Sequence, residues 1–195
     1  MKGGSSGSKR GEMSQNDRER LLHLLKTRAL ELRDVRLSSG RKSNYYVDSK
    51  RVILSSEGAY LAGKILLGMI RPEVGAVGGM TLGADPLVSS IAVLSHQQGR
   101  EMSALIVRKE PKKHGTMSYI EGPVIAAGTK VAVVDDVVTS GGSLLRSVER
   151  IAEAGYQPVQ VLAILDRQEG GQEAIAAAGY HLQSIFTRAD LGLGV

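Results

Sequence analysis

The sequence predicts an α/β fold in which a doubly wound, mainly parallel sheet is flanked by helices. Short apolar runs rich in β-branched residues recur along the 195-residue chain, at 74–79, 103–107, 131–134 and 159–165. Each run is too short for a helix and is typical of a strand buried on both faces. Longer segments with apolar residues at helical spacing lie between them, as in a sheet whose strands alternate with crossover helices.

The N-terminal part predicts a leader, a helix and a small hood. Residues 1–12 are rich in Gly and Ser, and we expect a flexible leader left by cloning, with residues 13–195 forming a single domain. Ser14 begins a segment that resembles a capping box, followed by a leucine-rich amphipathic helix that ends near Arg33. We expect the hood to comprise about residues 13–54, including a hairpin over 36–54, and the C-terminal tail.

The elements that follow are read from their start and stop signals. Ser56 is expected to cap a helix over 57–70, which Pro72 ends. A strand over 74–79 enters a glycine-rich turn, and a helix follows from about Leu87 to Gln98. A further strand is expected at 103–107. The last elements are a short strand and turn over 122–128, a strand over 159–165, an alanine-rich helix over 168–178 and a strand over 180–186.

Composition excludes several classes of protein. The chain has no cysteine, which excludes disulfides and thiolate metal sites, and no apolar run long enough to span a bilayer. We therefore expect a cytoplasmic protein without a membrane partner. The formal net charge of +5 favours anionic ligands, but one Phe and no Trp argue against a stacking platform for single-stranded nucleic acid.

The stretch VAVVDDVVTSGGSLLRSVERIAEAG, residues 131–155, carries the chemistry. A buried strand, an acidic pair, a loop of hydroxyls and glycines, and a helix follow one another. Glycines let the backbone approach an anion closely, and the free N–H groups of a helix N-terminus favour a phosphate. The acids would repel phosphate, so ribose hydroxyls, with or without Mg²⁺, suit them better. The alternative is a capped strand-to-helix turn with two solvated acids.

This stretch resembles the phosphoribosyl pyrophosphate (PRPP) motif of type I phosphoribosyltransferases. Two further segments resemble orotate phosphoribosyltransferases within that family: SGRKSNYYVD at 39–48 and RKEPKKHG at 108–115. Read alone, the first is a surface hairpin and the second a solvated, mobile charged loop. The resemblance implies transfer of the 5-phosphoribosyl group from PRPP to orotate, giving orotidine 5′-monophosphate and pyrophosphate in pyrimidine biosynthesis.

The resemblance also implies residue roles. Cations on a loop that closes over the site would stabilise the departing pyrophosphate. Catalytic roles fall to Lys109, Lys112, His114, Asp135 and Asp136. PRPP contacts fall to these residues and to Arg108, Val137, Val138, Thr139, Ser140, Gly141, Gly142, Ser143, Thr81 and Leu82; orotate contacts fall to Tyr45, Tyr46, Thr139 and Arg167.

The same resemblance implies Mg²⁺, held mainly by substrate and water, and a homodimer whose loop cations reach the neighbouring site. A one-residue slip would make Lys113 rather than Lys112 the functional lysine. Many members of the family have a lysine where this chain has Ser38, so Lys50 or Arg51 would supply that charge here. Two alternatives stay open: a purine phosphoribosyltransferase, and a regulator that senses PRPP and binds nucleic acid.

Overall fold

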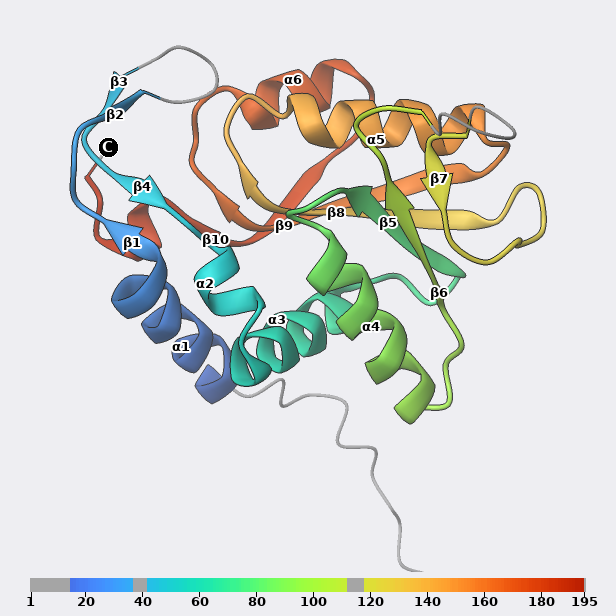
Figure 1. Ribbon diagram of the computed structural model, residues 1–195, viewed down its shortest axis with the longest axis horizontal. Coiled ribbons are helices and arrows are strands. Elements are labelled where there is room, and N and C mark those ends of the chain that lie inside the picture. The colour runs from blue at the N-terminus through green and yellow to red at the C-terminus, as the bar shows by residue number, and fades with distance from the viewer. Residues whose placement is uncertain (1–14, 37–41, 112–117, 195) are drawn as a thin grey trace, which may run out of the picture.

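The computed structural model describes residues 15–36, 42–111 and 118–194 (Figure 1). Its centre is a six-stranded sheet in the order β10-β9-β8-β5-β6-β7. The strands are β5 (Ala76–Met80), β6 (Ser103–Val107), β7 (Ile120–Glu121), β8 (Lys130–Val138), β9 (Gln157–Asp166) and β10 (Leu182–Thr187). Neighbouring strands pair in parallel, except that β7 pairs antiparallel to β6. The predicted fold class is confirmed.

Helices cover both faces of this sheet, as Figure 1 shows. One face carries α1 (Gln15–Leu24), α2 (Lys50–Ile53), α3 (Ser56–Met69) and α4 (Asp85–Gln97). The other face carries α5 (Gly142–Glu153) and α6 (Gly171–Ala177). Each layer encloses its own apolar core, which explains why the central strands lack the polar alternation of a half-solvated sheet.

Strand β8 shows how the alternation of side chains feeds both cores. Ala132 and Val134 belong to the core beneath α1–α4, whereas Val131 and Val133 belong to the core beneath α5 and α6. All four are buried. Because successive strand residues face opposite sides, an uninterrupted valine-rich run is what a central strand of this fold requires.

The N-terminal region differs most from the prediction. Helical structure ends at Ala29, not near Arg33, after a π-helical turn, η1 (Leu25–Ala29). Two short antiparallel pairs follow, β1 (Leu30–Glu31) with β4 (Tyr46–Val47) and β2 (Val35–Arg36) with β3 (Lys42–Ser43). The segment predicted as a hairpin therefore also contains the one-turn helix α2. Such short elements leave too few residues for a periodic pattern, so tertiary contacts decide them.

Smaller differences concern element ends. Ser55, not Ser56, caps α3, because its hydroxyl accepts the N–H of Gly58 at 3.2 Å. The short strand predicted within 122–128 lies at β7 instead. The chain closes with a 3₁₀ turn, η2 (Ala189–Leu191). None of the helices in the described ranges has the length and apolar character that crossing a membrane requires.

Candidate active site

The loop between β8 and α5 forms the first part of the site. Gly141 takes a left-handed φ of 80° and precedes the first residue of α5, and its carbonyl accepts the N–H of Leu145 at 3.0 Å. A Cβ at this φ would be strained, so glycine is the residue that suits the turn. The first turn of α5 therefore presents its free N–H groups beside the loop.

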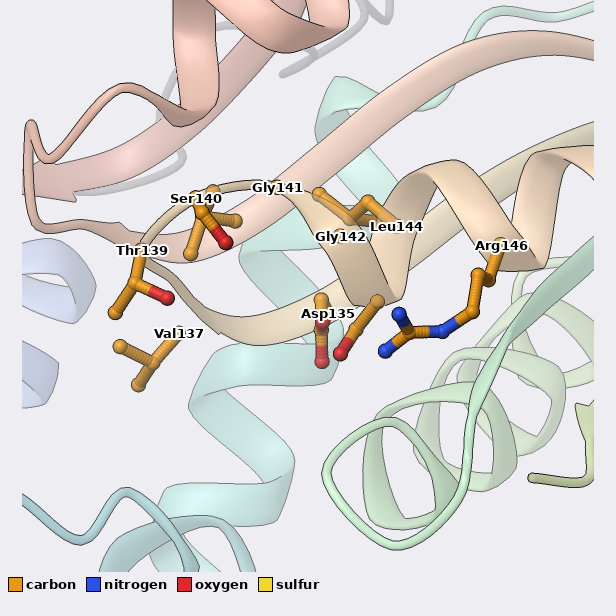
Figure 2. Close-up of a pocket in the computed structure, with 10 residues that line it drawn as sticks. Asp135, Val137, Thr139, Ser140, Gly141, Gly142, Leu144 and Arg146 are labelled. Atoms are coloured by element: carbon orange, nitrogen blue, oxygen red, sulfur yellow. The ribbon is translucent and has the colours of Figure 1, made fainter. Parts of the chain in front are cut away.

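A cavity of about 250 Å³ opens at this loop, and Figure 2 shows its lining. We call it the loop cavity. The predicted phosphate-contact residues Val137 to Ser143 all line it, together with Asp135. The sequence prediction missed Arg146, whose guanidinium points back towards the loop from the first turns of α5 (Figure 2). Its position three residues after Ser143, on the same helix face, is the signal that could have identified it.

A second cavity of about 260 Å³ shares three wall residues with the first: Asp135, Val137 and Ser143. We call it the acid cavity. Its other lining residues come from α2, the end of β5 and the turn after it, the residues after β6, and β8: Lys50, Met80, Thr81, Leu82, Gly83, Lys109 and Asp136. The structure thus brings the predicted Thr81, Leu82, Lys109 and acidic pair together around one space adjoining the phosphate loop.

The two acids lie within β8, which continues to Val138, whereas the sequence placed them at the end of the strand. Both of them line the acid cavity. Asp136 accepts a hydrogen bond from the Ser49 hydroxyl at the start of α2. Asp135 is buried, and its Oδ1 accepts the N–H of Asp136 at 3.0 Å.

Burial, reinforced by the neighbouring charge of Asp136, raises the pKa of Asp135 well above its usual range, and nearby Lys109 opposes this only weakly. A buried carboxyl needs a partner for its charged form. A ligand that offers hydroxyl donors or a cation would therefore favour ionised Asp135. This environment supports a binding role for the acid more than a structural one.

The turn after β5 approaches the acids closely. A side chain at Gly83 would collide with Asp136 Oδ1 and would lie 3.2 Å from Asp135 Oδ1. The Thr81 hydroxyl donates to Asp85 Oδ2 at 2.7 Å, and Leu82 is 70% exposed beside the acid cavity. Backbone groups and the Thr81 hydroxyl are therefore the polar groups that this turn offers a ligand, since it carries no cation.

Lys50 brings a cation to the acid cavity from α2. Its ammonium lies 3.1 Å from Asp48 Oδ1. Partial burial opposes protonation, but the contact with Asp48 and the charge of Asp136 raise the pKa of Lys50 above its usual value. Arg51 instead pairs with Glu31 at 2.6 Å and is not among the cavity-lining residues. Of the two cations that the sequence offered for the charge missing at Ser38, the structure places Lys50 on the cavity.

Tyr45 and Arg167 meet although they are far apart in the chain. Arg167 Nε donates to the Tyr45 hydroxyl at 3.0 Å, and its guanidinium carbon lies 4.2 Å from the centre of the Tyr45 ring. Both side chains are buried, and Arg167 also pairs with Glu169 at 2.9 Å. The backbone N–H of Arg167 donates to the Val138 carbonyl at 2.9 Å, which puts this group beside Thr139.

Tyr46 is not part of this contact. The Arg33 guanidinium carbon lies 5.3 Å from the centre of the Tyr46 ring, on the β1–β4 ribbon. Adjacent positions at a strand point to opposite sides, so only one of the two tyrosines can face Arg167. The sequence prediction assigned base contacts to both tyrosines.

The cationic segment after β6 is described in part. Arg108 pairs with Glu121 Oε1 at 3.0 Å, and its backbone N–H donates to the Tyr119 carbonyl at 2.8 Å. Lys109 is exposed and lines the acid cavity. Lys112, Lys113 and His114 lie outside the described residues, so their predicted roles stay predictions.

Comparisons with known proteins agree with this geometry. The phosphoribosyl transferase domain family matches residues 84–181. An orotate phosphoribosyltransferase of Thermosynechococcus vestitus is 53% identical over 174 residues, covering 89% of this chain and 92% of that protein.

Solved structures give the same result. A Mycobacterium tuberculosis orotate phosphoribosyltransferase in complex with Fe(III) dicitrate superposes with a TM-score of 0.79 at 38% identity. The same enzyme in complex with PRPP superposes with a TM-score of 0.75 at 36% identity. Each comparison covers 91% of this chain and 99% of the other. The chain therefore belongs to the orotate phosphoribosyltransferase family of type I phosphoribosyltransferases.

Proposed function

We propose that this chain transfers the 5-phosphoribosyl group from PRPP to orotate, using the two cavities for PRPP and the Tyr45–Arg167 contact for the base. The products are orotidine 5′-monophosphate and pyrophosphate, and the reaction is a step of pyrimidine biosynthesis. The observation that carries the proposal is the junction of the loop cavity and the acid cavity at Asp135 and Ser143. One phosphate-type site and one cation-lined site adjoin across an acidic pair, as a phosphorylated ribose with a pyrophosphate group requires.

The phosphoribosyl part of PRPP binds at the loop cavity. The 5-phosphate accepts hydrogen bonds from the loop N–H groups and hydroxyls of Thr139 to Ser143, with Arg146 adding charge. The ribose hydroxyls donate to Asp135 and Asp136, which offsets the cost of ionising the buried acid. The pyrophosphate then lies in the acid cavity against Lys50 and Lys109.

Catalysis in this arrangement needs no protein nucleophile. Negative charge builds on pyrophosphate as the bond to the anomeric carbon breaks, and fixed cations beside it stabilise that charge. Lys50 and Lys109, which line the acid cavity, take this role among the described residues, and Lys112 and His114 are predicted to share it. The chain also positions the orotate nitrogen behind the anomeric carbon, which lowers the entropic part of the barrier.

Arg167 is the proposed ligand of the orotate carboxylate. A guanidinium binds a carboxylate through two parallel hydrogen bonds, and Glu169 already offers it one such partner in this structure. Orotate would exchange with Glu169 while Tyr45 continues to support the guanidinium from its hydroxyl and ring. Tyr45 thereby packs beside the base.

Mg²⁺ is the proposed cofactor, and it would neutralise the pyrophosphate charge when bound. The described residues hold no cluster of three or more His, Asp or Glu side chains placed for a metal ion. The carboxylates of Asp135 and Asp136 face the acid cavity and supply oxygen atoms, the ligand type that Mg²⁺ prefers. We therefore expect the ion to be held mainly by PRPP oxygens and water.

A homodimer with loop cations shared between subunits also stays a proposal, supported by the resemblance of residues 108–115. Sedimentation of the protein at several concentrations tests the dimer. Mixing His114→Ala with Asp135→Asn protein tests the sharing, because activity is restored only if the intact loop of one chain reaches the intact acid of the other.

The function is tested by measuring pyrophosphate release from PRPP and Mg²⁺ with orotate, uracil, hypoxanthine, guanine and adenine offered separately. We expect release with orotate alone. Release with a purine would keep the PRPP site and overturn the base assignment. Tight PRPP binding without release for any base would favour a PRPP-sensing regulator, and salt-dependent duplex binding would then be the next measurement.

A further inference from the structure

Arg150 contacts the first two residues of the cationic segment, Arg108 and Lys109, and also Tyr119. It lies two turns along α5 from Ser143, on the helix face that bears Ser143 and Arg146. Its Nη1 donates to the backbone carbonyl of Arg108, and its Nη2 donates to the carbonyl of Lys109 at 3.1 Å. The guanidinium carbon also lies 4.0 Å from the centre of the Tyr119 ring.

Arg150 makes these contacts just beyond the end of β6, where the backbone is no longer paired within the sheet. Val107 is the last residue of β6, and its partner in β7 is Ile120. Beyond that pair, the Arg108 N–H donates to the Tyr119 carbonyl at 2.8 Å, and Lys109 lies further out. Arg150 therefore fixes the carbonyl of the residue whose side chain lines the acid cavity.

We infer that Arg150 is a positioning residue that aligns Lys109 with the phosphate loop by binding the Arg108 and Lys109 carbonyls from α5. The inference rests on the proposed function, in which Lys109 faces pyrophosphate. The same helix begins at the phosphate loop, so one rigid element sets the spacing between the 5-phosphate site and the cation that faces the other end of PRPP. Small errors in such spacing reduce catalysis strongly.

The guanidinium of an arginine suits this alignment better than the ammonium of a lysine. It is planar and has several donors, so it contacts two carbonyls and an aromatic ring at once. A lysine keeps the charge but lacks the paired donors. Arg150→Lys therefore separates a role in alignment from a role of charge alone.

Two ligands report on the two ends of the site. We would measure the binding of ribose 5-phosphate and of pyrophosphate, both with Mg²⁺, to wild type and to Arg150→Met by titration calorimetry. We expect pyrophosphate affinity and kcat each to fall about tenfold while ribose 5-phosphate affinity stays within about twofold. Arg150→Lys should resemble Arg150→Met. Tyr119→Leu, which keeps both carbonyl contacts, should give a smaller loss for pyrophosphate alone.

Arg100 supplies a matched control. Its guanidinium donates to the carbonyls of Ile70, Arg71 and Val74. These residues lie before the N-terminal ends of β5 and β6, whereas the site lies at the other end of the strands. Arg100→Met removes the same kind of contact, so we expect a lower melting temperature with both ligand affinities unchanged. A general loss of α5 packing in Arg150→Met would instead weaken both ligands together.

The inference is overturned if both ligands weaken equally, if neither changes, or if Arg150→Lys binds pyrophosphate like wild type. Failure of the proposed function gives a different result, because wild-type protein itself would then bind neither ligand or would transfer nothing to orotate.

Discussion

The groups facing the loop cavity all come from residues 135–146, whereas Tyr45 and Arg167 meet across a sequence separation of 122. The first region is one strand, one turn and the start of one helix, so its geometry is set by local backbone preferences. The second depends on the N-terminal ribbon packing against the end of β9. The phosphoribosyl side should therefore survive changes on the base side. The first predictions below concern the phosphoribosyl side, and those on Arg167 and the tyrosines concern the base side.

The largest effect is expected for Lys109→Ala. Removing the cation that lines the acid cavity should lower kcat about 10²–10³-fold, because charge on departing pyrophosphate loses its partner. The melting temperature should not change, since Lys109 is exposed. Lys130→Ala, an exposed lysine at the other end of β8, is the control and should retain full activity. A near-wild-type rate for Lys109→Ala would contradict the assigned role.

Asp135→Asn should separate function from stability. We expect activity to fall about 10²-fold, because ribose hydroxyls lose a charged acceptor. The same change removes the buried acid and should raise the melting temperature by about 2–4 °C, the shift that about 1 kcal/mol produces in a chain of this size. Steady-state kinetics and thermal unfolding at neutral pH measure the two effects.

The pH dependence of that stability has a definite sign. Because the pKa of Asp135 is raised in the folded state, the folded protein holds this proton more tightly than the unfolded chain. Its contribution to the unfolding free energy is present below the ordinary aspartate pKa and is lost as the pH rises through the raised folded pKa. The melting-temperature difference between Asp135→Asn and wild type should therefore widen with pH in this window. A difference that stays constant would mean that Asp135 titrates normally.

Arg167→Lys should affect the base side alone. The KM for orotate should rise about tenfold, because an ammonium cannot form the paired hydrogen bonds of a guanidinium. Ribose 5-phosphate affinity, measured in the same variant, should be unchanged. A parallel loss of both ligands would show that the two sides of the site are not independent.

The smallest effects compare the two adjacent tyrosines. Tyr45→Phe removes the hydroxyl that accepts from Arg167 Nε and should raise the orotate KM about threefold. Tyr46→Phe should change it less than about twofold, since that ring lies against Arg33 and not Arg167. The reverse order would assign the base contact to Tyr46.

The difference between the two regions also explains what could be predicted from sequence. Three features could be predicted because each is a local pattern with a physical cause: the valine run of β8, the glycine turn and the periodic face of α5. The cavity-lining role of Arg146 was missed, and the choice between Lys50 and Arg51 was left open, because both depend on where a side-chain rotamer or a one-turn helix places a charge. The choice between Tyr45 and Tyr46 depended on strand pairing, which neighbouring residues alone do not specify.

Gly171 carries a consequence for mutational tolerance. A Cβ there would lie 2.5 Å from Val138 Cγ1 and 2.7 Å from the Thr139 carbonyl oxygen, so the start of α6 rests directly on the phosphate loop. A saturation library over residues 168–178 should accept many side chains at the exposed positions of α6 and almost none at Gly171. A segment that touches no ligand by itself would thus contain one position as intolerant as the loop it supports.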